Sequence, residues 1–202
     1  MTDILPIQKY VSILTIGLLF ILPACSDNST GPDGNGLGEV NLTVSGDVEA
    51  QRTGQADFRE LEAASMYTWD LEFHDRNPQT FSLSIGLLSH EPIEQPGTGT
   101  FEIGFEPANP FEEQGAPVFL ASYTHIENED FANPKEFESG ILCPDEFPRG
   151  GEITITSSTS NEVSGTFQFS AVSVDFDDSG NCVNNGTINV TGEFTATPRI
   201  GA

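Results

Sequence analysis

The segment Ile153–Phe169, with the sequence ITITSSTSNEVSGTFQF, carries the most regular pattern of this chain. Ile153 and Ile155 alternate with threonines, and apolar alternation resumes at Val163 after the polar stretch Thr159–Glu162. Neighbouring side chains of a β-strand point to opposite faces, so this alternation is typical of two half-buried strands. The segment therefore predicts a hairpin with its turn at Thr159–Glu162 and, with it, an all-β fold.

The same period of two recurs along most of the chain. Alternating apolar positions occur in the segments Val40–Val44, Tyr67–Phe73, Phe81–Leu87, Phe101–Phe105, Val118–His125 and Ile188–Ala196. Arg76–Gln79 has the composition of a turn and predicts a second hairpin. Eight or nine mostly antiparallel strands follow. An antiparallel β-sandwich is the favoured architecture, and a lipocalin-like closed β-barrel is the alternative.

Two segments depart from simple alternation. Ala56–Met66 fits either a short helix or an irregular edge strand. At Ala171-Val172 the alternation slips by one residue, so that Val174 and Phe176 occupy the alternate positions that are polar in the preceding part of the strand. A β-bulge at this point would keep both side chains facing inward, and we expect one there.

The chain is strongly acidic. Among 202 residues, 7 Lys and Arg stand against 31 Asp and Glu, which gives a formal net charge of -24. Such a surface repels nucleic acid and bare anionic membranes, so neither is an expected partner. A solvated, salt-tolerant surface accounts for this composition, and a cation-binding surface is the alternative.

The N-terminal segment Tyr10–Cys25, YVSILTIGLLFILPAC, follows Lys9 and has the parts of an export signal. Its apolar core is shorter than the ~20 residues that a transmembrane helix needs. Its ending, Leu22-Pro23-Ala24-Cys25, resembles the lipobox of bacterial lipoproteins. The alternatives are an ordinary signal peptide with a coincidental cysteine and an uncleaved anchor helix.

The lipobox resemblance implies that Cys25 is the lipidated N-terminus of the mature protein, because several acyl chains together give a stable anchor. Residues 1–24 are then a signal peptide, 25–38 a lipidated cysteine with a flexible tether, and 39–202 one β-rich domain. Ser26 stands where an Asp marks inner-membrane retention in other bacteria, so the expected location is the outer membrane. Membrane contact is expected through the lipid alone.

The C-terminal region carries a second, less specific resemblance. The segments ITITSSTSNEVSGTFQF and NGTINVTGEF together resemble the C-terminal meander of uncharacterised β-rich lipoproteins of Gram-negative bacteria. This resemblance implies no activity.

Cys143 and Cys182 remain once Cys25 carries lipid. The cell envelope is oxidising, and both cysteines extend from the open end of the hairpin that turns at Thr159–Glu162. We therefore expect a Cys143–Cys182 disulfide. Two free thiols and a two-cysteine metal site are the alternatives.

Candidate metal ligands are sparse. Asp175, Asp177 and Ser179 begin a D-x-D-x-S-G pattern that resembles a calcium loop, but Gly186 replaces the bidentate Glu of its twelfth position. An acidic hairpin loop is the favoured interpretation. The three histidines, His74, His90 and His125, lack the spacing of zinc ligands and are expected to be exposed or hydrogen-bonded.

Catalytic patterns are equally weak. The carboxylate pairs Glu112-Glu113 and Glu127 with Glu129 suit a glycosidase only formally, because such pairs arise by chance in so acidic a chain. Trp69 with Tyr67 suits a sugar-stacking platform, but alternation with neighbouring apolar residues favours core packing. No residue is assigned a catalytic role and no cofactor is expected.

The function predicted from these patterns is that of a lipid-anchored cell-envelope protein. Its β domain would be a non-catalytic binding or structural module for an unidentified protein, glycan or small-molecule ligand. A lipocalin-like carrier of a small apolar ligand and an envelope hydrolase are the alternatives.

Overall fold

The computed structural model describes residues 38–63, 66–75, 79–104, 117–140 and 150–199. The predicted signal peptide, the tether up to residue 37, Cys25, Cys143 and Glu112-Glu113 lie outside these residues. All described residues belong to one compact unit. Within them, no helix has the length and apolar character that crossing a membrane requires.

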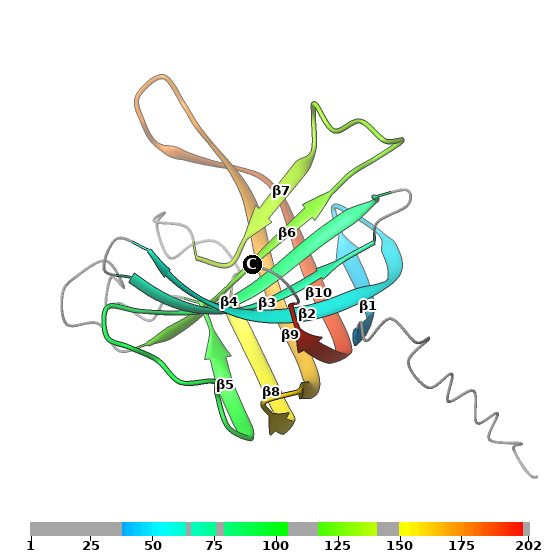
Figure 1. Ribbon diagram of the computed structural model, residues 1–202. Coiled ribbons are helices and arrows are strands. Elements are labelled where there is room, and N and C mark those ends of the chain that lie inside the picture. The colour runs from blue at the N-terminus through cyan, green and yellow to red at the C-terminus, as the bar shows by residue number, and fades with distance from the viewer. Residues whose placement is uncertain (1–37, 64–65, 76–78, 105–116, 141–149, 200–202) are drawn as a thin grey trace, which may run out of the picture. The chain divides into compact units, whose positions relative to one another are not determined.

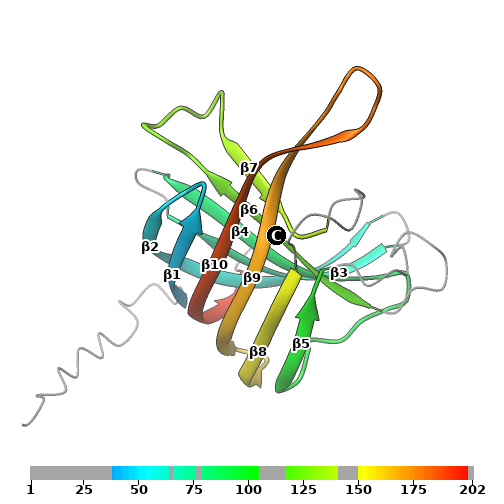
Figure 2. The same cartoon turned by 180° about the vertical axis from the view of Figure 1, so that it is seen from behind.

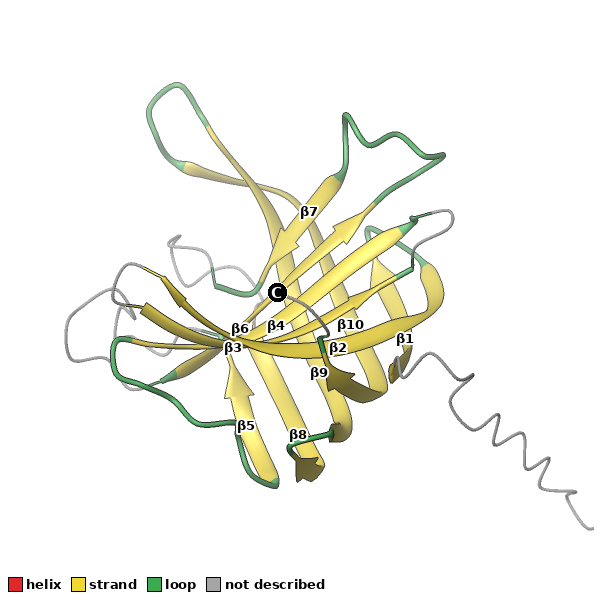
Figure 3. Cartoon of the chain, viewed as in Figure 1, coloured by secondary structure: helices red, strands yellow, loops and turns green. Residues whose placement is uncertain are grey.

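The described residues form ten strands joined by turns and loops (Figure 3). They are β1 (Gly38–Gly46), β2 (Ala50–Ala63), β3 (Met66–His74), β4 (Phe81–Ser89), β5 (Gly99–Ile103), β6 (Val118–His125), β7 (Lys135–Glu138), β8 (Gly150–Thr159), β9 (Glu162–Phe176) and β10 (Cys182–Pro198). The ambiguous segment Ala56–Met66 is a strand over most of its length, at the end of β2.

The ten strands form one mixed sheet that curls into a near-closed ring (Figure 1). Antiparallel pairing runs continuously from β5 through β8, β9, β10, β1, β2, β3 and β4 to β6. The ring closes weakly where β5 meets β6 at one parallel pair, Ile103 with Phe119, and β7 bridges β6 and β9. The all-β prediction is confirmed, whereas the sandwich favoured from sequence differs from this single continuous sheet.

The inward face of the ring is packed with apolar side chains. Trp69, Leu71 and Phe73 of β3 are fully buried, as their alternation predicted. Phe73 lies 5.5 Å from both Phe167 and Phe194 between ring centroids, so aromatic side chains from opposite parts of the ring meet at its centre. The expected role of Trp69 in the core is confirmed.

The hairpin predicted from Ile153–Phe169 is confirmed. Thr159 pairs with Glu162 across the turn between β8 and β9. The register shifts between Ile155 and Ser157, where Gly165 of β9 lies against the opposite backbone.

The β-bulge predicted at Ala171-Val172 is wrong. β9 stays in register with β10 there, and the irregularity lies in β10 between Asn184 and Gly186. Val172 is buried beside β7, which pairs with it through Glu138. Phe176 is 67% exposed, because β9 and β10 continue past the ring as a projecting hairpin that has no interior to face (Figure 2).

Candidate functional site

The outward face of β3, β4 and β6 carries two rows of polar side chains. The first row consists of Glu72, Ser84 and Ser122, and the second of His74, Ser82 and Thr124. Members of each row are direct cross-strand partners, because alternation places every second residue of these strands on the outside. Four of the six side chains are hydroxyls.

A groove of about 370 Å³ lies over these rows. Gln79, just before β4, and Arg199, just after β10, complete its polar lining. Hydroxyl groups both donate and accept hydrogen bonds, whereas the Glu72 carboxylate only accepts and the Arg199 guanidinium only donates. The groove, hereafter the serine groove, therefore suits a ligand with many hydrogen-bonding groups.

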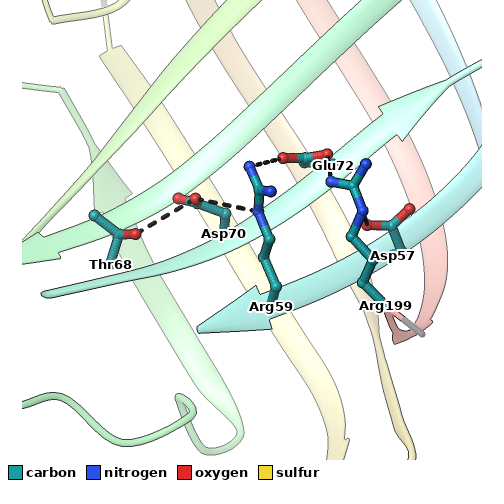
Figure 4. Close-up of polar contacts among 6 residues, drawn as sticks. All are labelled: Asp57, Arg59, Thr68, Asp70, Glu72 and Arg199. Atoms are coloured by element: carbon teal, nitrogen blue, oxygen red, sulfur yellow. Dashed lines mark hydrogen bonds and ion pairs between the residues drawn. The ribbon is translucent and has the colours of Figure 1, made fainter. Parts of the chain in front are cut away.

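Charges of alternating sign border the serine groove on the side of β2 (Figure 4). In order, the ladder comprises Asp57, Arg199, Glu72, Arg59 and Asp70. The guanidinium groups of Arg59 and Arg199 each contact one carboxylate oxygen of Glu72. Glu72 is thereby held in place at the edge of the groove.

Asp70 is the outer member of this ladder. Burial raises the pKa of its carboxyl group and Glu72 raises it further, whereas Arg59 and a hydrogen bond from Thr68 oppose the shift. Arg59 Nε lies 4.0 Å from Asp70 Oδ2. Gly86 of β4 leaves the necessary space, because a Cβ atom at that position would lie 2.5 Å from Asp70 Oδ1.

The end of β10 covers the inner member of the ladder. Thr197 and Pro198 pair in parallel with Asp57 and Phe58 of β2, and the Arg199 amide donates to the Phe58 carbonyl over 2.9 Å. Asp57 is only 3% exposed as a result. The arginine that completes the groove is thus positioned by main-chain pairing.

The calcium candidates lie in the projecting hairpin. Asp177 Oδ1 accepts hydrogen bonds from the amides of Ser179 and Asn181, each over 2.8 Å, and Asp177 Oδ2 accepts from the Asn181 side chain. These hydrogen bonds, that of Asn181 foremost, lower the pKa of Asp177. Asp175 accepts from the Asn185 amide. The carboxylate of Asp177 thus caps the loop, as in the acidic hairpin loop favoured from sequence.

The three histidines are not brought together. His74 lines the serine groove, His90 follows the far end of β4, and His125 ends β6. In the described parts of the chain, no group of three or more His, Cys, Asp or Glu side chains is arranged to hold a metal ion.

The remaining predicted residues are scattered. Cys182 is the first residue of β10, and its pairing with Cys143 stays a prediction. Glu127 and Glu129 are exposed. Tyr67 lies on the same inward-facing side of β3 as Trp69, but near the start of the strand, where it is only half-buried.

Comparison of the chain with protein-family models, curated proteins and solved structures finds no match. The serine groove was not predicted from sequence. The only sign of it in the sequence is that serine and threonine occupy the outward positions of β4 and β6, and many half-buried strands share this feature.

Proposed function

We propose that this chain is a lipid-anchored protein of the bacterial outer membrane whose β domain is a non-catalytic binding module. The serine groove is its binding site, and the ligand is a neutral, hydroxyl-rich molecule such as a saccharide. The Leu22-Pro23-Ala24-Cys25 ending supports the anchor, and the geometry of the groove supports the ligand class.

We infer the class of ligand from the strand register, which sets the polar side chains of the two rows next to one another. Saccharides present closely spaced hydroxyls that donate and accept, and the cross-strand partners Ser84 and Ser122 offer the same capacity on adjacent strands. Glu72, fixed by two arginines, adds a strong acceptor. At this external groove, where both arginines are already paired with Glu72, the formal net charge of -24 disfavours an anionic ligand.

The packed interior favours this proposal over the carrier alternative. A carrier encloses its ligand in an apolar cavity, whereas the inward positions here hold large buried side chains such as Trp69, Phe73 and Tyr123. An external groove needs no rearrangement of that core.

The ligand proposal is tested by recording two-dimensional NMR spectra of residues 39–202 with a panel of neutral oligosaccharides. We expect shifts confined to β3, β4 and β6 for at least one member of the panel. Ser84→Val and Ser122→Val should weaken its binding about tenfold, a loss of about 1.4 kcal/mol. Ser170→Val is the matched control, because Ser170 lies on the outward side of β9 and bonds to Asn189.

Absence of saccharide-dependent shifts, or equal binding by Ser84→Val and the control, would contradict the ligand proposal. The anchor is tested separately by mass spectrometry of the N-terminus of protein extracted from membranes. We expect a lipid-modified Cys25, and loss of membrane association in Cys25→Ser. An unmodified Cys25 would remove the anchor without affecting the groove.

A further inference from the structure

One end of the ring interior is polar. It lies where β2 begins, β4 begins and β6 ends, and it is built from Arg52, Tyr123 and His125. Arg52 shares the inward parity of Ala56 and Phe58, which are both buried. We call these three residues the polar end of the interior.

Aromatic rings form the floor of this polar end. Tyr123 is 0% exposed and stacks with Phe81, at 6.5 Å, and with His125, at 6.4 Å between ring centroids. The Arg52 guanidinium lies near enough to Tyr123 and His125 to act on the pKa of both groups. Side chains from β2 and β6, on different sides of β3 and β4, therefore converge here.

A hydrogen bond from the Arg52 side chain lowers the pKa of Tyr123, but Arg52 only donates and so gives the Tyr123 O–H no acceptor. Three polar atoms at this end are buried and have no acceptor among the described residues. They are Arg52 Nε, Tyr123 Oη and His125 Nδ1. Buried polar atoms in folded proteins are nearly always satisfied, because leaving one unpaired sacrifices its interaction with water. Three such atoms on converging side chains indicate a site that an additional group completes.

Nearby carboxylates do not supply that group. Asp75 Oδ1 accepts from the amides of Thr80, over 2.7 Å, and Phe81, over 3.2 Å, and Oδ2 accepts from the Thr80 hydroxyl over 2.5 Å. Glu127, beyond the end of β6, is exposed, and so is the cationic Lys135, which pairs with His125 at the start of β7. Among the described residues, no carboxylate is bonded to Arg52 Nε, so this cation lacks an anionic partner at that atom.

We propose that the polar end of the interior binds a small oxyanion, either a carboxylate or a phosphate. Arg52 Nε–H only donates, and the neutral Tyr123 hydroxyl and His125 imidazole can donate as well, so an acceptor with several lone pairs satisfies all three atoms. Burial raises the pKa of Tyr123 and lowers that of His125, which keeps both groups uncharged near neutral pH. This site is separate from the serine groove on the outside of the ring.

The test is isothermal titration of the folded domain with inorganic phosphate and with acetate, each against sodium chloride at matched ionic strength. We expect phosphate or acetate to bind, and the tighter of the two to identify the oxyanion class. Tyr123→Phe, which removes a single oxygen atom, and Arg52→Gln should each weaken binding about tenfold. Tyr67→Phe is the matched control, because it removes the equivalent oxygen atom from a tyrosine at the opposite end of β3 and should leave binding unchanged.

Two results would overturn the proposal. One is the absence of any response beyond that to chloride, which would mean that water alone satisfies these atoms. The other is equal binding by wild type, Tyr123→Phe and Arg52→Gln, which would place the oxyanion elsewhere. Changes in the aromatic NMR signals of Tyr123 and His125 on titration of the wild type keep the test valid even if Arg52→Gln does not fold.

Discussion

Asp57 of β2 and Arg199, just beyond β10, face each other with 3.9 Å between Oδ1 and Nε. They lie near opposite ends of the described chain, and the parallel pairing of β10 with β2 brings them together. Asp57 is almost completely buried under this segment. The pair thus joins the C-terminal end of the sheet to the charged ladder beside the serine groove.

Arg199→Gln should destabilise the domain by about 1–3 kcal/mol, because it leaves the buried Asp57 carboxylate without its cation. Asp57→Asn in the same chain should restore part of the loss, since a neutral amide needs no counter-charge. Urea unfolding of both variants and of Asp57→Asn alone completes a double-mutant cycle. Additive effects would show that the two residues do not interact.

Gly165→Ala should destabilise the domain by about 1–3 kcal/mol, because overpacking forces the backbone apart. A Cβ atom at Gly165 would lie 2.1 Å from the Thr154 carbonyl oxygen of the neighbouring strand. Gly97→Ala is the control, since nothing lies within 4 Å of a Cβ atom there. Equal unfolding midpoints for the two variants would contradict the close packing of β8 on β9.

Stability should depend on the protonation of His125. Burial lowers its pKa, as do Arg52 and Lys135, while Glu127 opposes them. The unfolded chain therefore binds the proton first as the pH falls through about 6.5, so the contribution of neutral His125 is present above that pH and is lost below it.

The measurement is the difference in unfolding free energy between wild type and His125→Gln at about pH 7.5 and about pH 5. We expect the wild type to lose more stability than the variant on acidification. His90→Gln serves as the control for replacing an imidazole at a strand end. If the difference in unfolding free energy between wild type and His125→Gln is the same at both pH values, His125 is not the source of the pH dependence.

Millimolar calcium should leave the melting temperature unchanged. Asp177 already accepts from the backbone and side chain of Asn181 and from Ser179, so its oxygens are directed at donors of the loop. The measurement is thermal unfolding with calcium and with chelator. A rise that Asp175→Ala with Asp177→Ala abolishes would instead support the calcium loop.

Cys143 and Cys182 should form a disulfide in protein exported to the cell envelope. Intact-mass analysis without reductant should show the loss of two hydrogens, and Cys182→Ser should remove this difference. The bond should stabilise the domain by about 2–4 kcal/mol, because it restricts the unfolded chain. Alkylation of both cysteines without prior reduction would contradict the pairing.

The projecting hairpin and the serine groove illustrate what local patterns leave open. Phe176 is apolar and lies on a strand, yet it is exposed because β9 extends beyond the ring at this end. Ser84 and Ser122 are ordinary outward residues of their own strands, and only the pairing of β4 with β6 sets them side by side. The polar end of the interior was missed for a similar reason, because Arg52 resembles an outward arginine when its strand is considered alone.

The amino-acid sequence by itself determined the all-β character, the inward residues of β3 and β4, and the hairpin turn at Thr159–Glu162. Each of these follows from the two-residue period of a strand or from local turn chemistry. The tertiary structure alone decided which strands are neighbours: the closure of the ring, the parallel pairing that places Arg199 over Asp57, and the convergence of Arg52 with Tyr123. Alternation specifies the face on which a side chain lies, whereas strand pairing specifies what it meets.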